Sequence, residues 1–159
     1  MRSLLMMICA SLVLIPAGAA ADPGSAPAAE TAESLRFEVS FPESYSTQPL
    51  TGRMFVILAR DGKREPRQQV GRYGVQLFGV DFSELKPGQN VVIDGTTLGY
   101  PINRLSDLQP GDYFVQAVLN KYTRFDRSDG HTVWLHMDQW EGQRWTRSPG
   151  NAFCQARKI

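Results

Sequence analysis

From residue 35 onward several segments of the chain alternate apolar and polar side chains with a period of two, and this alternation limits the fold more than any other feature. The first such run has its apolar residues at Leu35, Phe37, Val39 and Phe41. Successive side chains of a strand point to opposite faces, so the run predicts a half-buried β-strand. Beyond residue 21, no window of about eleven residues keeps apolar side chains at helical spacing. The sequence therefore predicts an all-β fold.

Further strands are predicted by short apolar runs between turn residues. Met54–Ala59 is continuously apolar and ends just before the turn signal Asp61-Gly62, which indicates a strand covered on both faces. Residues 78–82 and 91–93 are shorter candidates. Residues 113–120 and 133–137 alternate strongly and flank an Asp-Gly turn, so we expect them to pair as a long antiparallel hairpin.

Proline and glycine divide the rest of the chain into short connections. Single helical turns are predicted at 83–85 or at 106–108. With six to eight short strands and frequent turns, the best match is an Ig-like antiparallel β-sandwich. Pro110 and Gly111 form a turn directly before Tyr113, which suggests a tyrosine corner, in which the hydroxyl bonds back over the preceding turn. The alternative is an ordinary turn followed by an aromatic strand residue.

The N-terminus has the pattern of a secretory signal peptide. Arg2 precedes an apolar run from Leu4 to Ile15, and the segment ends in the small residues 17–21. The apolar run is shorter than the roughly 20 residues of a membrane span. We expect cleavage after Ala21 and an exported, periplasmic or secreted protein that meets the membrane only during export; an uncleaved anchor is the alternative.

Residues 22–33 contain no large apolar side chain and are predicted to be a flexible spacer, which leaves 34–159 as the β-sandwich domain. Charged residues make up 21% of the chain, and its formal net charge is +1. Such a balance argues against nucleic acid as a partner. Cleavage would leave one cysteine, Cys154, which we interpret as an incidental small apolar residue.

Motifs for catalysis or metal binding are not apparent. Ser148 lacks the Gly-x-Ser-x-Gly context of a hydrolase nucleophile. His131 and His136 are five residues apart, which places them on opposite faces of a strand, with one at a turn and the other toward solvent. Asp126, Ser128 and Asp129 do not have the spacing of a calcium loop, and a solvated hairpin tip is favoured. We therefore expect no catalytic residue, metal or cofactor.

Two surface features remain as candidates for binding. The first is a basic stretch, Arg60, Lys63, Arg64, Arg67 and Arg72, interpreted as a solvated loop, with an acidic partner surface or polysaccharide as the alternative. The second is a group of aromatic residues, whose candidate binding members are Tyr122, Trp134, Trp140 and Trp145. Exposed rings of this kind would stack on sugars or on another domain, whereas buried rings would belong to the core.

Several phrases of the sequence together resemble a known family. They are Phe55–Gly62, Glu65–Arg67, Gly99–Pro101, Pro110–Ala117, Phe125–Gly130 and Ser148–Asn151. The chain from about Leu35 to Asn151 resembles the N-terminal β-sandwich module of large secreted bacterial esterases, in which the module precedes an α/β-hydrolase domain of the enterochelin-esterase type. The resemblance implies that catalytic residues belong to that hydrolase domain, and that none lies in this chain.

The first expectation is therefore a non-catalytic exported module that packs against an esterase-type hydrolase or positions its substrate. The alternative is a stand-alone module that binds carbohydrate or cell-envelope material through its surface aromatics. A third hypothesis is an enzyme whose site is assembled from distant Asp, Glu, His or Arg residues.

Overall fold

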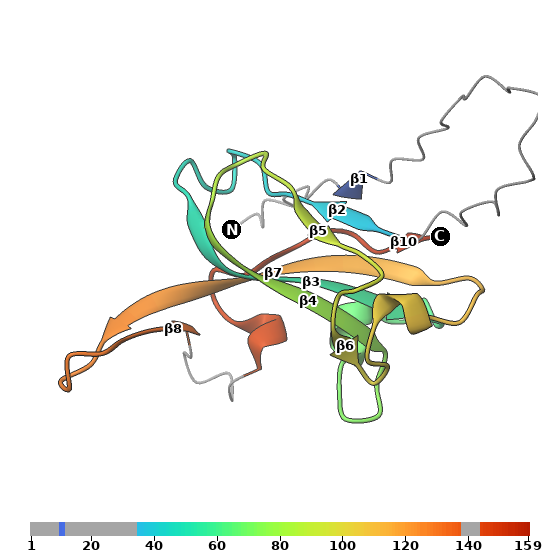
Figure 1. Ribbon diagram of the computed structural model, residues 1–159. Helices are drawn as coiled ribbons and strands as arrows, with labels where there is room; N and C mark the ends of the chain where they lie inside the picture. The colour runs from blue at the N-terminus through green and yellow to red at the C-terminus, as the bar shows by residue number, and fades with distance from the viewer. Residues whose placement is uncertain (1–9, 12–34, 138–143) are drawn as a thin grey trace, which may run out of the picture.

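The computed structural model describes residues 10–11, 35–137 and 144–159, and within them the fold is an all-β sandwich (Figure 1). The strand pairings are antiparallel, as predicted. Helical structure in these ranges is confined to three short 3-10 helices, η1 (Pro66–Gln69), η2 (Leu105–Asp107) and η3 (Trp145–Arg147). The strands are β1 (Ala10–Ser11), β2 (Phe37–Val39), β3 (Leu50–Ala59), β4 (Gln76–Leu85), β5 (Val91–Ile93), β6 (Gly99–Tyr100), β7 (Phe114–Asp126), β8 (Thr132–His136), β9 (Ala152–Phe153) and β10 (Arg157–Lys158).

The strands form two sheets. The small sheet has the order β1-β2-β5, and the large sheet has the order β10-β7-β3-β4-β6, with β8 and β9 also pairing with β7. β3 pairs with β4 on one side and with β7 on the other over most of its length. This central position explains the apolar run Met54–Ala59, because such a strand is covered on both faces, as the sequence predicts.

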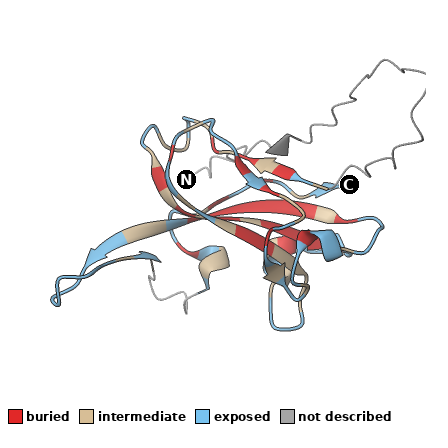
Figure 2. Cartoon of the chain, in the orientation of Figure 1, coloured by how far each residue is buried: buried red, intermediate tan, exposed pale blue. Residues whose placement is uncertain are grey.

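The main core lies between the two sheets (Figure 2). Alternate residues of the large sheet point toward β2 and β5, because side chains alternate along each strand. In the register of the sheet, Val56 lies opposite Phe78 on β4 and opposite Ala117 on β7. The largest fully buried side chains of this core are Phe41, Phe78, Met54, Leu58, Ile93, Leu105 and Leu119.

The other face of the large sheet is covered by η1, which contacts β3 and β7, and by η3, which contacts β7. Ile57 and Val118 are fully buried on this face, and the Trp145 ring stacks on Phe55 with 4.3 Å between ring centroids. Gln116 is 1% exposed on the same face. The two helices that cover this face, η1 and η3, were not predicted, because each is too short to show a helical periodicity in its sequence.

The predicted hairpin is present, but its register differs from the prediction. β8 pairs with Tyr122–Asp126 at the far end of β7, whereas Phe114–Lys121 pairs with β3. β7 is thirteen residues long, so its first part is a strand of the large sheet and its last part extends beyond that sheet. The turn between β7 and β8 contains Gly130 with φ +83°, a left-handed conformation that glycine adopts readily.

The turn before β7 has the hydrogen bond that defines a tyrosine corner. Tyr113 Oη donates to the Gln109 carbonyl oxygen at 2.7 Å, across a turn in which Gly111 has φ +135°. The Arg60 guanidinium lies 4.1 Å from the centroid of the Tyr113 ring and donates to the Pro110 carbonyl at 3.3 Å. Through these contacts with Arg60, the turn formed by Pro110, Gly111 and Tyr113 fixes the end of β3 beside the start of β7.

Of the two predicted helical turns, one is observed and one is wrong. η2 falls at 105–107, close to the predicted 106–108, whereas 83–85 lies inside β4. Leu85 is buried in the core and Leu50 lies opposite it on β3, so the pairing of two apolar side chains prevails over a local turn. Of the predicted leader and spacer, only β1 is described, and its Ala10 pairs with Val39.

Candidate functional site

The most prominent surface feature is the hairpin arm, which we define as residues 122–136. It comprises the end of β7, the turn and β8, and it projects away from the sandwich (Figure 1). Most of its residues are exposed (Figure 2). Directly opposed residues of an antiparallel pair share a face, so the register of β7 and β8 gives the arm two different faces.

One face of the arm is apolar. Phe125 lies opposite Val133, and Leu135 lies opposite Thr123. Phe125 is 39% exposed and Leu135 is 54% exposed, while Val133 is partly buried. A contiguous apolar surface of this kind is typical of a protein contact.

The other face of the arm carries Tyr122 and Trp134, two of the predicted binding aromatics. Tyr122 lies opposite His136, and Trp134 lies opposite Arg124 and is 43% exposed. Tyr122 Oη lies 3.4 Å from Asp81 Oδ1. Partial burial raises the pKa of Tyr122, and the neighbouring carboxylate adds to this effect, so its hydroxyl stays protonated at neutral pH.

Contacts on the large sheet connect Trp145 to Tyr122. Trp145 stacks on Phe55, and Arg53 lies 5.5 Å from the Phe55 centroid. Arg53 also forms an ion pair with Asp81 at 2.8 Å, and Asp81 is the partner of Tyr122. The structure thus brings Tyr122 and Trp145 into one row of polar and aromatic side chains.

This row is continuous with the face of the arm that carries Trp134, because Tyr122 and Trp134 project from the same face of the hairpin. Trp140 lies outside the described residues. Arg53, Phe55 and Asp81 were missed by sequence reasoning. The one pattern that could have indicated them is the position of Arg53 and Phe55 between buried residues of β3.

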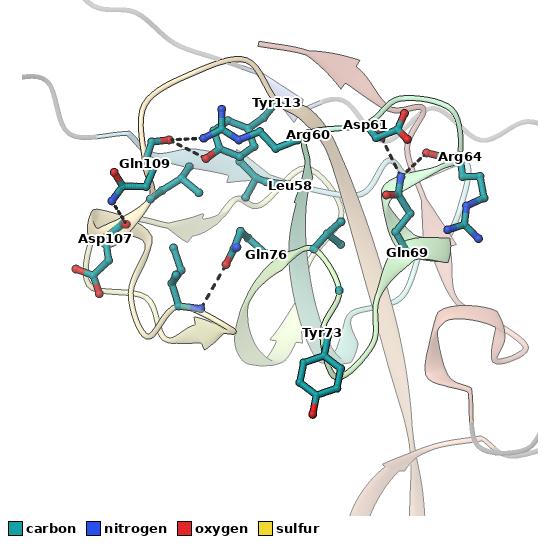
Figure 3. A pocket seen from close by; sticks show the side chains of 14 residues that line it. Leu58, Arg60, Asp61, Arg64, Gln69, Tyr73, Gln76, Asp107, Gln109 and Tyr113 are labelled. Atoms are coloured by element: carbon teal, nitrogen blue, oxygen red, sulfur yellow. Dashed lines mark hydrogen bonds between the residues drawn. The ribbon is translucent and has the colours of Figure 1, made fainter.

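A second candidate is a cleft at the opposite end of β3 (Figure 3). It has a volume of about 550 Å³ and lies between the segment that follows β3 and the turn that carries η2. Leu58, Val75, Ile102 and Leu108 contribute apolar surface. The polar and aromatic lining residues are Arg60, Asp61, Arg64, Gln69, Tyr73, Gln76, Asp107, Gln109 and Tyr113. Ligand pockets in proteins have volumes of roughly 300 to 1,000 Å³, so this cleft can hold a small molecule.

The basic stretch is only partly a solvated loop. Arg67 packs 3.7 Å from the Phe153 centroid, forms an ion pair with Glu65 at 2.6 Å and donates to the Thr146 carbonyl at 3.1 Å. It is therefore a structural residue of the covered sheet face. Arg60 and Arg64 instead line the cleft.

The remaining sequence candidates have structural partners. Ser148 is buried. Hydrogen bonds from Thr132 and Arg124 lower the pKa of Asp126, and Asp129 pairs with Arg127 at 2.8 Å. Among the described residues, no cluster of three or more His, Cys, Asp or Glu side chains could hold a metal ion.

The two histidines differ in how far they are exposed to solvent. His131 is exposed in the turn of the arm, at the predicted turn position. His136 lies opposite Tyr122 on the arm and is partly buried, rather than freely exposed to solvent as predicted.

Cys154 has the environment of a structural thiol. It is buried beside β7, and its Sγ accepts a hydrogen bond from the Ala117 N–H at 3.1 Å. Burial raises the pKa of the thiol and keeps it in the unreactive protonated form at neutral pH.

Comparisons of the chain with protein-family models, with curated proteins and with solved structures gave no significant match. In the part of the chain that the structure describes, no helix has the length and apolar character needed to cross a membrane.

Proposed function

We propose that the chain is a non-catalytic exported module that packs against an esterase-type hydrolase through the apolar face of the hairpin arm. The observation that carries the proposal is the exposure of Phe125 and Leu135 on one face of a projecting hairpin. Exposing such side chains to water is unfavourable, and contact with a partner would remove this cost.

The position of the arm supports the same proposal. Its tip carries the phrase Phe125–Gly130, which is part of the resemblance to the esterase-associated module. Aromatic and aliphatic side chains at the centre of an interface commonly supply most of its binding energy. The arm offers such side chains without disturbing the sandwich, because its residues lie beyond the β3–β7 pairing.

The first prediction concerns this contact. An esterase-type hydrolase from the same genome should bind the purified chain in calorimetric titration. The double variant Phe125→Ser/Leu135→Ser should weaken binding by at least about tenfold, since both apolar anchors are lost. Val92→Ser changes an exposed apolar residue of the small sheet and should leave binding unchanged. Equal loss in both variants, or hydrolysis of p-nitrophenyl esters by the chain alone that one of its own side-chain replacements abolishes, contradicts the proposal.

A second candidate function is binding of carbohydrate or cell-envelope material by the aromatic row. The observation in its favour is the exposed Trp134 on the face that also carries Tyr122, next to the Arg53–Asp81 ion pair. Rings beside charged hydrogen-bonding groups suit sugars, which present apolar C–H faces and hydroxyl edges.

The prediction for this candidate is measured by retention on insoluble polysaccharides. Trp134→Ala should reduce retention at least about fivefold, because loss of a stacked ring costs about 1 kcal/mol or more. Phe125→Ala, on the opposite face of the arm, is the matched control and should be retained like the unaltered chain. Unchanged retention of Trp134→Ala and Trp145→Ala rules out the platform.

A further inference from the structure

The cleft at the end of β3 has features of a binding site that are independent of the arm. We infer that it binds an acidic saccharide, with a sugar ring against Tyr73, the sugar carboxylate at Arg64 and the hydroxyl groups at Gln69 and Gln76. This inference does not rest on the proposed hydrolase partner, because the arm and the cleft share no residue.

Charge favours an anionic ligand at the cleft. Arg60 and Arg64 line it, and Lys63 and Arg72 belong to the same segment. None of these four cations forms an ion pair within the described residues. Within the lining, the carboxylates of Asp61 and Asp107 balance Arg60 and Arg64, so the positive surplus comes from Lys63 and Arg72 beside the cleft. This surplus attracts anionic ligands to the mouth of the cleft.

Arg60 and Arg64 differ in what they can offer. Arg60 is held by the Tyr113 ring and by the carbonyl oxygens of Gln109 and Pro110, so it supplies charge from a fixed position. Arg64 is exposed, and within the described residues its hydrogen bonding is limited to its backbone carbonyl, which accepts from Gln69 Nε2 at 2.8 Å. Its guanidinium can form a bidentate contact with a ligand carboxylate.

Two carboxamides of the cleft are fixed by one end only (Figure 3). Gln69 Nε2 donates to the carbonyls of Asp61 and Arg64, and Gln76 Oε1 accepts from the Ile102 N–H at 3.3 Å. Among the described residues, no hydrogen bond reaches Gln69 Oε1 or Gln76 Nε2. One free acceptor and one free donor in fixed positions suit hydroxyl groups, which both donate and accept.

Tyr73 supplies an aromatic surface at the mouth. Its side chain is 90% exposed, although it lines the cleft, and Arg72 lies 5.6 Å from its ring centroid. The segment is anchored, since Tyr100 Oη donates to the Arg72 carbonyl at 2.6 Å. The exposed Tyr73 ring presents a face on which the C–H groups of a sugar can stack.

The same lining argues against a phosphate-rich ligand. Asp61 and Asp107 would repel a doubly charged phosphate group more strongly than the single carboxylate of one sugar ring, and their own carboxylates can accept hydrogen bonds from sugar hydroxyls. The combination of cations, carboxylates, carboxamides and one aromatic ring therefore fits a singly charged, hydroxylated ring, which is a uronic acid unit.

The test uses the full chain and trigalacturonate as the probe. Calorimetric titration should show binding, and maltotriose, an uncharged trisaccharide, should bind at least about tenfold more weakly. Arg64→Gln and Tyr73→Ala should each weaken trigalacturonate binding by at least about tenfold. Both side chains are exposed, so the fold should persist. In an amide-proton NMR titration the side-chain signals of Gln69 and Gln76 should shift.

Arg147→Gln, an exposed arginine of η3 outside the cleft lining, and Trp134→Ala are the matched controls and should bind like the unaltered chain. Three results would overturn the inference: no binding of trigalacturonate, equal binding of maltotriose, or loss of binding in Trp134→Ala but not in the two cleft variants. Tighter binding of inorganic phosphate than of trigalacturonate would also reject it.

Discussion

Replacing Phe78 with alanine is expected to lower the free energy of unfolding by about 3–5 kcal/mol, as is typical when a large buried aromatic side chain is removed. Phe78 is fully buried near the start of β4, opposite Val56 on β3. Its ring also packs against the backbone of Gly99 on β6, where an added Cβ would lie 2.4 Å from the ring. Such close packing leaves little room for neighbouring groups to fill the cavity.

Urea unfolding monitored by tryptophan fluorescence measures this effect. Phe125→Ala is the matched control, because it removes the same side chain from the exposed face of the hairpin arm and should change the free energy of unfolding by about 0.5 kcal/mol or less. If Phe78→Ala lowered the free energy of unfolding no more than Phe125→Ala does, Phe78 would not belong to the core between the two sheets.

The strands could be predicted from sequence because alternation reports directly on which side chains are buried. Val91–Ile93 is β5 as predicted, and the alternating residues of Tyr113–Asn120 lie on the two faces of β7 as expected. The partner of a strand is less predictable. The turn at Gly130 indicates that a hairpin exists. The sequence does not indicate that the first part of β7 pairs with β3 and that only its last part pairs with β8.

The candidate sites were harder to predict, because their residues are distant in sequence. Trp145 and Tyr122 are connected through Arg53 and Asp81, which come from β3 and β4. The cleft likewise joins two segments, each of which looks like an ordinary polar loop. Basic residues of one stretch therefore acquire different roles: Arg67 packs against the Phe153 ring, while Arg64 lines the cleft.

Gln116 is a buried polar residue that connects several segments on the covered face of the large sheet. Its Oε1 accepts from the Arg67 N–H at 3.0 Å, and its Nε2 donates to the Cys154 carbonyl at 2.8 Å and to Glu65 Oε2 at 3.2 Å. One buried carboxamide thus connects η1, the C-terminal segment and β7. Polar groups can be buried at little cost in free energy only when they are hydrogen-bonded. An apolar residue at position 116 would leave the partners of Gln116 without a hydrogen bond.

Gln116→Leu keeps the size of the side chain but removes these hydrogen bonds, and it should lower the free energy of unfolding by about 3 kcal/mol, because the Arg67 N–H and the Cys154 carbonyl lose their partner in a buried site. Urea unfolding provides the measurement. Gln155→Leu changes an exposed glutamine of the same segment and should have an effect of about 0.5 kcal/mol or less. Gln116 holds the Arg67 backbone, and Arg67 donates to the Thr146 carbonyl of η3, so Gln116→Leu should increase proteolytic cleavage near η3. Phe78→Ala changes the core on the other face of the sheet and should not have this effect. Equal stability of Gln116→Leu and Gln155→Leu would show that the covering segments are held by apolar packing alone.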